Sequence, residues 1–260
     1  MFCMETKNLK LKKLCVVMSA LMLFSGVLKA GEYENIKNKM EIFSKKIEDS
    51  ITHPTTDNIV KGGNKEYKEW ELQMDYIYKK FLSELEKSKN FKAKNSLIES
   101  QKAWLKFREA ESKYNYYVDS GDGEGTIRSI SLISSLVKTT EERTFELAQL
   151  YDNFIKNNNE LKNKKSPKET YENANSKLNE EYKKLIDVLK KLNHKNSINA
   201  LTASKLEWDN YIKKEAIFRH YLFNEDKEIE KGIVYYDTLA KFTNERYEYL
   251  KDELNILEKN

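Results

Sequence analysis

The sequence is short of cysteine, and both of its cysteines stand near the start of the chain. Cys3 precedes a run of apolar residues and Cys15 stands at the beginning of that run, while no cysteine follows. A lipid-modified cysteine would follow such a run, so we do not expect a lipoprotein. Exported proteins can fold without disulfides, and we expect none in the rest of this chain.

Long hydrophobic runs are also absent, apart from 15 residues at Leu14–Leu28. A membrane-spanning helix needs about 20 apolar residues. Four lysines precede the run, and Lys29, Ala30 and Gly31 follow it before the sequence turns polar. This pattern predicts a signal peptide over residues 1–30 with cleavage after Ala30, and no membrane span after cleavage. The alternative is an uncleaved membrane anchor.

No excess of either charge remains once the predicted signal peptide is set aside. Residues 1–30 carry five lysines and one glutamate of the chain's 46 basic and 42 acidic residues, which leaves 41 of each sign. Proteins that bind nucleic acid or anionic lipid need a basic excess or a basic stripe. We therefore expect no nucleic-acid partner.

Proline and glycine are scarce, and strand-like alternation is missing. The two prolines, Pro54 and Pro167, stand before and between long segments with helical spacing of apolar residues. These features predict an all-α fold.

The sequence holds no recognisable catalytic or metal-binding pattern. The three histidines, His53, His194 and His220, are scattered, and no zinc, phosphate-loop or nucleophile motif occurs. The acids between Asp119 and Glu124 lack the spacing of a calcium loop. We expect a protein that is not an enzyme and that uses no cofactor or metal.

What the sequence does contain is an internal repeat. Aligned at an offset of 104 residues, 78–104 matches 182–208 with nine identities in 27 pairs, among them Trp104 with Trp208. The offset falls to 103 further on, where Arg143 aligns with Arg246. Two copies of one unit that differ by a one-residue loop deletion explain the pattern.

The repeat divides the chain into a signal peptide at 1–30, an N-terminal helix and linker at 31–65, repeat one at 66–155, a polar linker at 156–167 and repeat two at 168–260. Each repeat has three helical segments joined by short connections, which predicts two tandem antiparallel three-helix bundles. The expected segments are 66–89, 91–118 and 126–155, then 168–192, 196–223 and 227–257. The glycines in Lys61–Asn64 are expected to form a flexible entry to repeat one.

The run from Gln101 to Glu111, followed by Thr140, Glu142 and Arg143, resembles the LprI-type lysozyme inhibitor domain. The resemblance covers about 70–151 well and 174–250 in a degenerate form. It implies an exported α-helical domain that binds and blocks a peptidoglycan hydrolase. The residues that carry the family motif, for which we expect a structural role, are Trp104, Phe107, Arg108, Glu111, Arg143, Trp208 and Arg246.

The chain departs from the family pattern at several positions. The family's two cysteines are replaced by Ser112 and Ser135 in repeat one and by Ala216 and Thr238 in repeat two. Repeat two also has Lys205 in place of Gln101 and Ile212 in place of Arg108. The resemblance therefore implies the family's activity more strongly for repeat one.

Glutamates and arginines both fall on the apolar stripes, as Glu111 and Arg143 and again as Glu215 and Arg246. Within one hairpin Glu111 and Arg143 would lie about 15 Å apart along the helix axis, too far for an ion pair. We therefore expect Arg143 to stack on Trp104, and Arg246 on Trp208.

The second helix of each repeat ends in aromatic residues and leads into acids. In repeat one the candidate binding residues are Tyr116, Tyr117, Asp119, Asp122 and Glu124. In repeat two the corresponding aromatics are Phe218, His220, Tyr221 and Phe223. Such an end could grip a cationic partner, or its aromatics could be half-buried core beside a solvated acidic loop.

These observations lead to one function and one alternative. The expected function is inhibition of a lysozyme-like muramidase by occlusion, in the periplasm or outside the cell. The alternative is a non-inhibitory scaffold of the cell envelope that binds another protein or a glycan.

Overall fold

The structure is a computed structural model, and it describes residues 31–119, 126–156, 167–223, 229 and 232–259. The described residues form helices without a strand, which confirms the all-α prediction. The predicted signal peptide lies outside them. The helices are α2 (Glu32–Ser50), α3 (Thr56–Lys87), α4 (Phe91–Val118), α5 (Ile127–Ile155), α6 (Pro167–Lys191), α7 (Lys195–Phe223) and α8 (Ile233–Leu257).

The helix α3 begins at Thr56, ten residues before the expected start, and runs through the predicted flexible entry. The Thr55 hydroxyl caps the helix by accepting a hydrogen bond from the Asn58 N–H at 3.3 Å. A Cβ on Gly62 or Gly63 would come within 2.9 Å of Ile51 or Ile133. These glycines therefore allow neighbouring side chains to approach the helix, and the expectation of flexibility was wrong.

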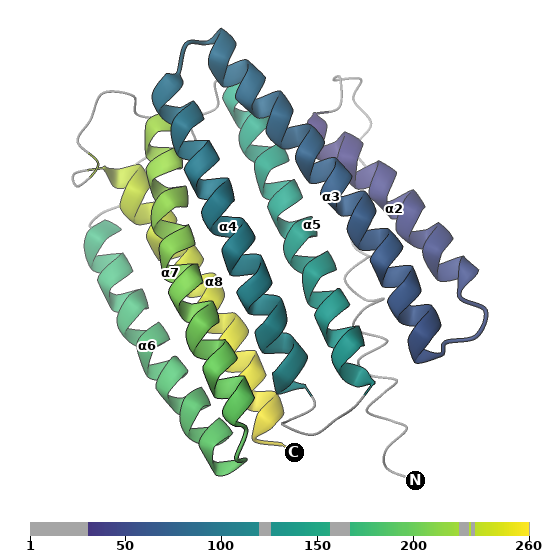
Figure 1. The fold of residues 1–260 in the computed structure, drawn as a ribbon. Helices are drawn as coiled ribbons and strands as arrows, with labels where there is room; N and C mark the ends of the chain where they lie inside the picture. Colours follow the sequence, from purple (N-terminus) through teal and green to yellow (C-terminus); the bar gives the residue numbers. More distant parts are fainter. Residues whose placement is uncertain (1–30, 120–125, 157–166, 224–228, 230–231, 260) are drawn as a thin grey trace, which may run out of the picture.

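The two repeats dock through their second helices. Contacts between α4 and α7 are the most extensive in the molecule, while α3 packs mainly on α5 and α6 mainly on α8 (Figure 1). Ser100 contacts Glu215, and Glu111 contacts Ser204, so α4 and α7 run antiparallel. The alignment makes Ser100 equivalent to Ser204, and Glu111 to Glu215. The repeats are thus related by an approximate twofold axis between α4 and α7.

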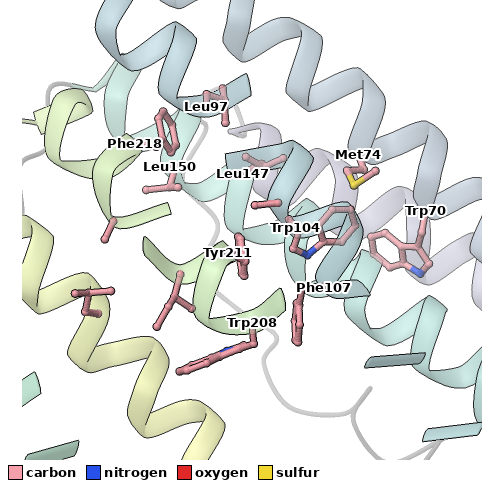
Figure 2. Close-up of a cluster of buried hydrophobic side chains, with 14 of the residues drawn as sticks. Trp70, Met74, Leu97, Trp104, Phe107, Leu147, Leu150, Trp208, Tyr211 and Phe218 are labelled. Carbon is pink, nitrogen blue, oxygen red and sulfur yellow. The ribbon is translucent and has the colours of Figure 1, made fainter. Parts of the chain in front are cut away.

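One hydrophobic core runs across both repeats. Trp104 and Leu147 from repeat one lie in the same buried cluster as Trp208 and Phe218 from repeat two (Figure 2). The ring of Phe107 stacks on that of Tyr211, with centroids 5.9 Å apart. Burial of aromatic side chains on both sides of the α4–α7 contact stabilises the docked arrangement.

Candidate functional site

The candidate site of repeat one lies where α4 ends and α5 begins. Tyr116 and Tyr117 are half-buried, and their rings meet edge to face with centroids 5.1 Å apart. The Arg128 guanidinium lies over both rings, at 5.3 Å and 5.6 Å from their centroids. Asp119 is exposed and accepts a hydrogen bond from the Ser131 hydroxyl. Asp122 and Glu124 lie outside the described residues.

Arg128 was missed by the sequence reasoning, which considered only the aromatics and acids. The signal was available, because the first turn of α5 must face the last turn of α4 across a short connection. The arginine lies near the C-terminal end of α4, where the helix dipole favours a positive charge. Described side chains at this end therefore offer two aromatic rings, a cation and a carboxylate to a partner.

The corresponding end of repeat two is packed into the molecule. Phe218 and His220 are fully buried, and the Phe218 ring contacts that of Phe81 in repeat one. The backbone carbonyl of Tyr221 accepts a hydrogen bond from the Asn90 side chain at 3.2 Å. For Phe218 and His220, the core interpretation left open by the sequence is the right one. The two ends are therefore not equivalent surfaces.

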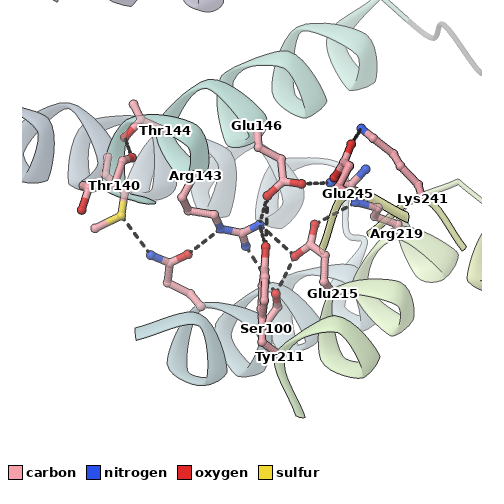
Figure 3. A network of polar contacts seen from close by, with 12 residues as sticks. Ser100, Thr140, Arg143, Thr144, Glu146, Tyr211, Glu215, Arg219, Lys241 and Glu245 are labelled. Carbon is pink, nitrogen blue, oxygen red and sulfur yellow. Dashed lines mark hydrogen bonds and ion pairs between the residues drawn. The ribbon is translucent and has the colours of Figure 1, made fainter. Parts of the chain in front are cut away.

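The most prominent polar feature is a buried network at the junction of the repeats (Figure 3). Arg143, only 2% exposed, pairs with Glu215 of repeat two at 3.0 Å and with Glu146 at 2.7 Å. Its guanidinium also donates to Gln101 at 3.2 Å and to the Tyr211 hydroxyl at 3.1 Å. Several polar partners thus satisfy this buried cation.

A second network repeats this arrangement with the roles of the repeats exchanged. Arg246 of repeat two donates to both oxygens of Glu111 in repeat one, at 2.7 Å and 2.8 Å. It also donates to the Tyr182 hydroxyl at 3.0 Å and to Ser204 at 3.2 Å. A bidentate contact of this kind is among the strongest ion pairs that proteins form.

The electrostatics of the two glutamates follow from these contacts. Burial alone would raise the pKa of Glu215, but Arg143 and Arg219 outweigh it and lower the pKa to about 2. Burial likewise opposes ionisation of Glu111, and Arg246 nevertheless holds its pKa below the ordinary value. Both glutamates are therefore charged at neutral pH, and each is paired with an arginine of the other repeat.

The expected stacking of Arg143 on Trp104 and of Arg246 on Trp208 was wrong. Arg143 lies 5.4 Å from the centroid of Tyr211, and Arg246 lies 5.6 Å from that of Phe107, each in the opposite repeat. The distance argument that separated glutamate from arginine within one repeat assumed a single hairpin. Antiparallel docking of α4 on α7 brings each arginine to the glutamate of the other copy.

Arg108 is the residue that stacks on Trp104. Its guanidinium carbon lies 5.0 Å from the centroid of the Trp104 ring and 5.3 Å from that of the Tyr67 ring. It also pairs with Glu71 at 3.1 Å. Burial, together with the hydrogen bond to Glu71, raises the pKa of the Tyr67 hydroxyl to about 12. Ile212 stands at the equivalent place in repeat two, so this arrangement belongs to repeat one alone.

Among the described residues, metal ligation would need a group of polar side chains around one point, and membrane crossing would need a long apolar helix. No group of three or more His, Cys, Asp or Glu side chains in that part of the chain is arranged to hold a metal ion. Among the described helices, none combines the length and the apolar character that crossing a membrane requires.

Comparisons with known proteins support the repeat and the fold. A crystal structure of an uncharacterised protein from Burkholderia thailandensis is similar, with a TM-score of 0.54 and 17% identity over 82% of this chain and 96% of that one. This likeness concerns the fold alone. No curated protein matched the sequence. The profile of the family "Lysozyme inhibitor LprI" matches twice, at residues 49–147 and 157–250, in agreement with the two-copy prediction. The chain therefore belongs to the LprI lysozyme inhibitor family.

Proposed function

We propose that this protein is exported and inhibits a lysozyme-like muramidase by occluding its substrate cleft. Membership of a lysozyme inhibitor family carries the proposal. The predicted signal peptide supports export to the periplasm or beyond the cell. Occlusion requires binding alone, which fits a chain without a recognisable catalytic motif.

The surface we assign to the enzyme is the end of repeat one formed by Tyr116, Tyr117, Asp119 and Arg128. Tyrosine and arginine are the residue types that contribute most at protein interfaces. Both tyrosines are partly accessible, and Asp119 is exposed, so its negative charge favours a cationic partner. Asp122 and Glu124, which the sequence analysis also names as candidate binding residues, follow within five residues of Asp119 and add negative charge.

A titration of purified lysozymes with the protein beginning at Gly31 tests the function. Peptidoglycan hydrolysis should fall in proportion to added protein until one inhibitor is present for each enzyme. The inhibition should weaken above physiological salt, because charge attraction to a cationic enzyme is screened. Full activity at a high micromolar excess across the panel would contradict the proposal and favour a non-inhibitory envelope scaffold.

Substitutions test the assigned surface separately. Tyr117→Ala combined with Asp119→Ser should weaken inhibition about tenfold or more, since hot-spot residues contribute about 2 kcal/mol each. The matched control combines Tyr247→Ala with Asp187→Ser, which removes a half-buried tyrosine and an exposed aspartate on α8 and α6. Equal inhibition by the two double variants would place the contact elsewhere.

A further inference from the structure

The first turn of α2 is held by a residue far along the chain. The backbone N–H groups of Glu32 and Tyr33 donate to the two carboxylate oxygens of Asp152 on α5, at 2.9 Å and 3.1 Å. The first N–H groups of a helix have no partner within the helix, and here Asp152 supplies one. The helix α2 packs on α3 and α5, so this contact fixes its starting point (Figure 1).

The residue before this turn lies against the same carboxylate. A Cβ on Gly31 would stand 2.1 Å from Asp152 Oδ2, so a side chain at this position would force the Asp152 carboxylate to move. The Gly31 backbone has φ −67°, a value that any residue adopts, so the close approach of Asp152 is the constraint on this position. The backbone nitrogen of Gly31 lies within roughly 4.6 Å of Asp152 Oδ2, because N and Cβ on one Cα are about 2.5 Å apart.

Asp152 has no cationic partner among the described residues. The nearby Lys80 pairs with Glu32 at 2.5 Å, and Glu32 also accepts a hydrogen bond from the Tyr76 hydroxyl. From the described residues, Asp152 accepts hydrogen bonds from the two backbone N–H groups alone. A partly buried carboxylate in this position would gain from a positive charge beside it.

We propose that Asp152 binds the α-ammonium group of the mature N-terminus at Gly31. The proposal uses the predicted cleavage after Ala30 and does not depend on lysozyme inhibition. Hydrolysis by a signal peptidase adds one water across the Ala30–Gly31 bond, leaving a carboxylate on Ala30 and an ammonium on Gly31. The new cation then lies beside Asp152, and the ion pair fastens α2 to α5.

The helix dipole adds a reason for this pairing. A positive charge at the N-terminal end of a helix is unfavourable, so a free ammonium at Gly31 would weaken α2 unless a nearby anion compensates. Asp152 is positioned to compensate. Among the described residues, the titratable groups that face the site are Glu32 on α2, Tyr76 and Lys80 on α3, and Tyr151 and Asp152 on α5.

Thermal unfolding of two forms of the protein beginning at Gly31 tests the proposal. One form has a free amino group and the other is acetylated at Gly31. At pH 7 the free form should unfold about 2–4 °C higher, the shift expected for one additional ion pair in a protein of this size. A midpoint for the acetylated form that equals or exceeds that of the free form would overturn the proposal.

The pH dependence supplies a second readout in the unmodified protein. The free α-amino group titrates near about 8 in an unfolded chain, and Asp152 should raise its pKa in the folded state. The added stability should therefore be present below pH 8 and disappear as the pH rises through the raised pKa. An α-amino pKa in the folded protein equal to that of a free peptide, measured by NMR, would contradict the pairing.

Asp152→Asn should abolish the advantage of the free form over the acetylated form, or reverse it through the helix dipole, because it removes the anion and keeps a hydrogen-bond acceptor. Thr55→Ala provides the control, since it removes the N-cap of α3 and should lower both midpoints equally. Persistence of the free form's advantage in Asp152→Asn would assign the effect to another group.

Discussion

At the scale of single residues, some buried charges of this protein have opposite charges beside them, while at least one partly buried carboxylate lies among other acids. Arg143 and Glu215 are buried in this way, and each is satisfied by residues of both repeats. Glu141 on α5 is the partly buried carboxylate that lies among other acids. Burial and the negative charges of Glu66 and Glu142 raise its pKa to about 7. Its ionised form therefore opposes folding at neutral pH.

This environment predicts that Glu141→Gln raises the stability of the protein in a pH-dependent way. The folded-state pKa lies above the ordinary value of 4.5, so the carboxyl supports folding below pH 4.5 and loses that contribution as the pH rises through 7. At pH 8 the variant should be more stable than the parent by on the order of 1 kcal/mol, a value discounted for partial exposure. The difference should vanish at pH 4.

Urea unfolding at the two pH values measures the effect. Glu99→Gln is the control, because hydrogen bonding to Lys102 lowers the pKa of Glu99, and its neutralisation should bring no gain at pH 8. An equal difference between Glu141→Gln and the parent at pH 4 and pH 8 would show that Glu141 has no raised pKa.

At the scale of helices, the connection between the first and second helices has the same backbone conformation in both repeats. After α3, Lys89 adopts a left-handed backbone with φ 59°, and after α6 the equivalent Asn193 does the same. In both copies a hydrogen bond runs back across the turn, from Asn90 N–H to Leu85 and from His194 N–H to Leu189, each 2.9 Å. This is the usual end of a helix before a sharp turn.

Lysine is a poor residue for that conformation, so Lys89→Gly should stabilise the protein by about 0.5–1 kcal/mol. Asn193→Gly should gain less, because asparagine tolerates a left-handed backbone. Lys68→Gly, at an exposed position inside α3, should cost about 1 kcal/mol. Thermal unfolding of the three variants provides the measurement, and a loss of stability in Lys89→Gly would contradict the assignment of this turn.

The sequence identified most helices because their apolar spacing is regular and their connections are short. Trp104 and Trp208 were assigned to equivalent helical faces, and both are buried. The sequence-based prediction of a flexible linker at Gly62 and Gly63 was wrong, because the side chains of Ile51 and Ile133 pack against these glycines. The structural role of a glycine in a helix depends on the side chains that pack against it, and the local sequence does not specify these side chains.

At the scale of the whole molecule, the two repeats form one body. The sequence suggested two bundles in tandem and left their docking open, because no local pattern specifies how α4 meets α7. Once they meet antiparallel, each arginine reaches the glutamate of the other repeat. The candidate site showed the same limit, since Tyr116 and Tyr117 were found from sequence but their contact with Arg128 was not.

A consequence of cross-repeat pairing is that the loss of one partner leaves a buried charge. Glu111→Gln should cost about 3–5 kcal/mol, because Arg246 then lacks its counter-ion. Arg246→Met should cost a similar amount. The double variant should lose much less stability than the two single variants added together, since no unpaired buried charge remains.

The most direct test is a pair of double-mutant cycles measured by urea unfolding. One cycle combines Glu111→Gln with Arg246→Met, across the repeats, and the other combines Glu111→Gln with Arg143→Met, within repeat one. We expect a coupling free energy of about 2 kcal/mol or more in the first cycle and additivity within about 0.5 kcal/mol in the second. Coupling of Glu111 to Arg143 with none to Arg246 would contradict the docking of the two repeats described above.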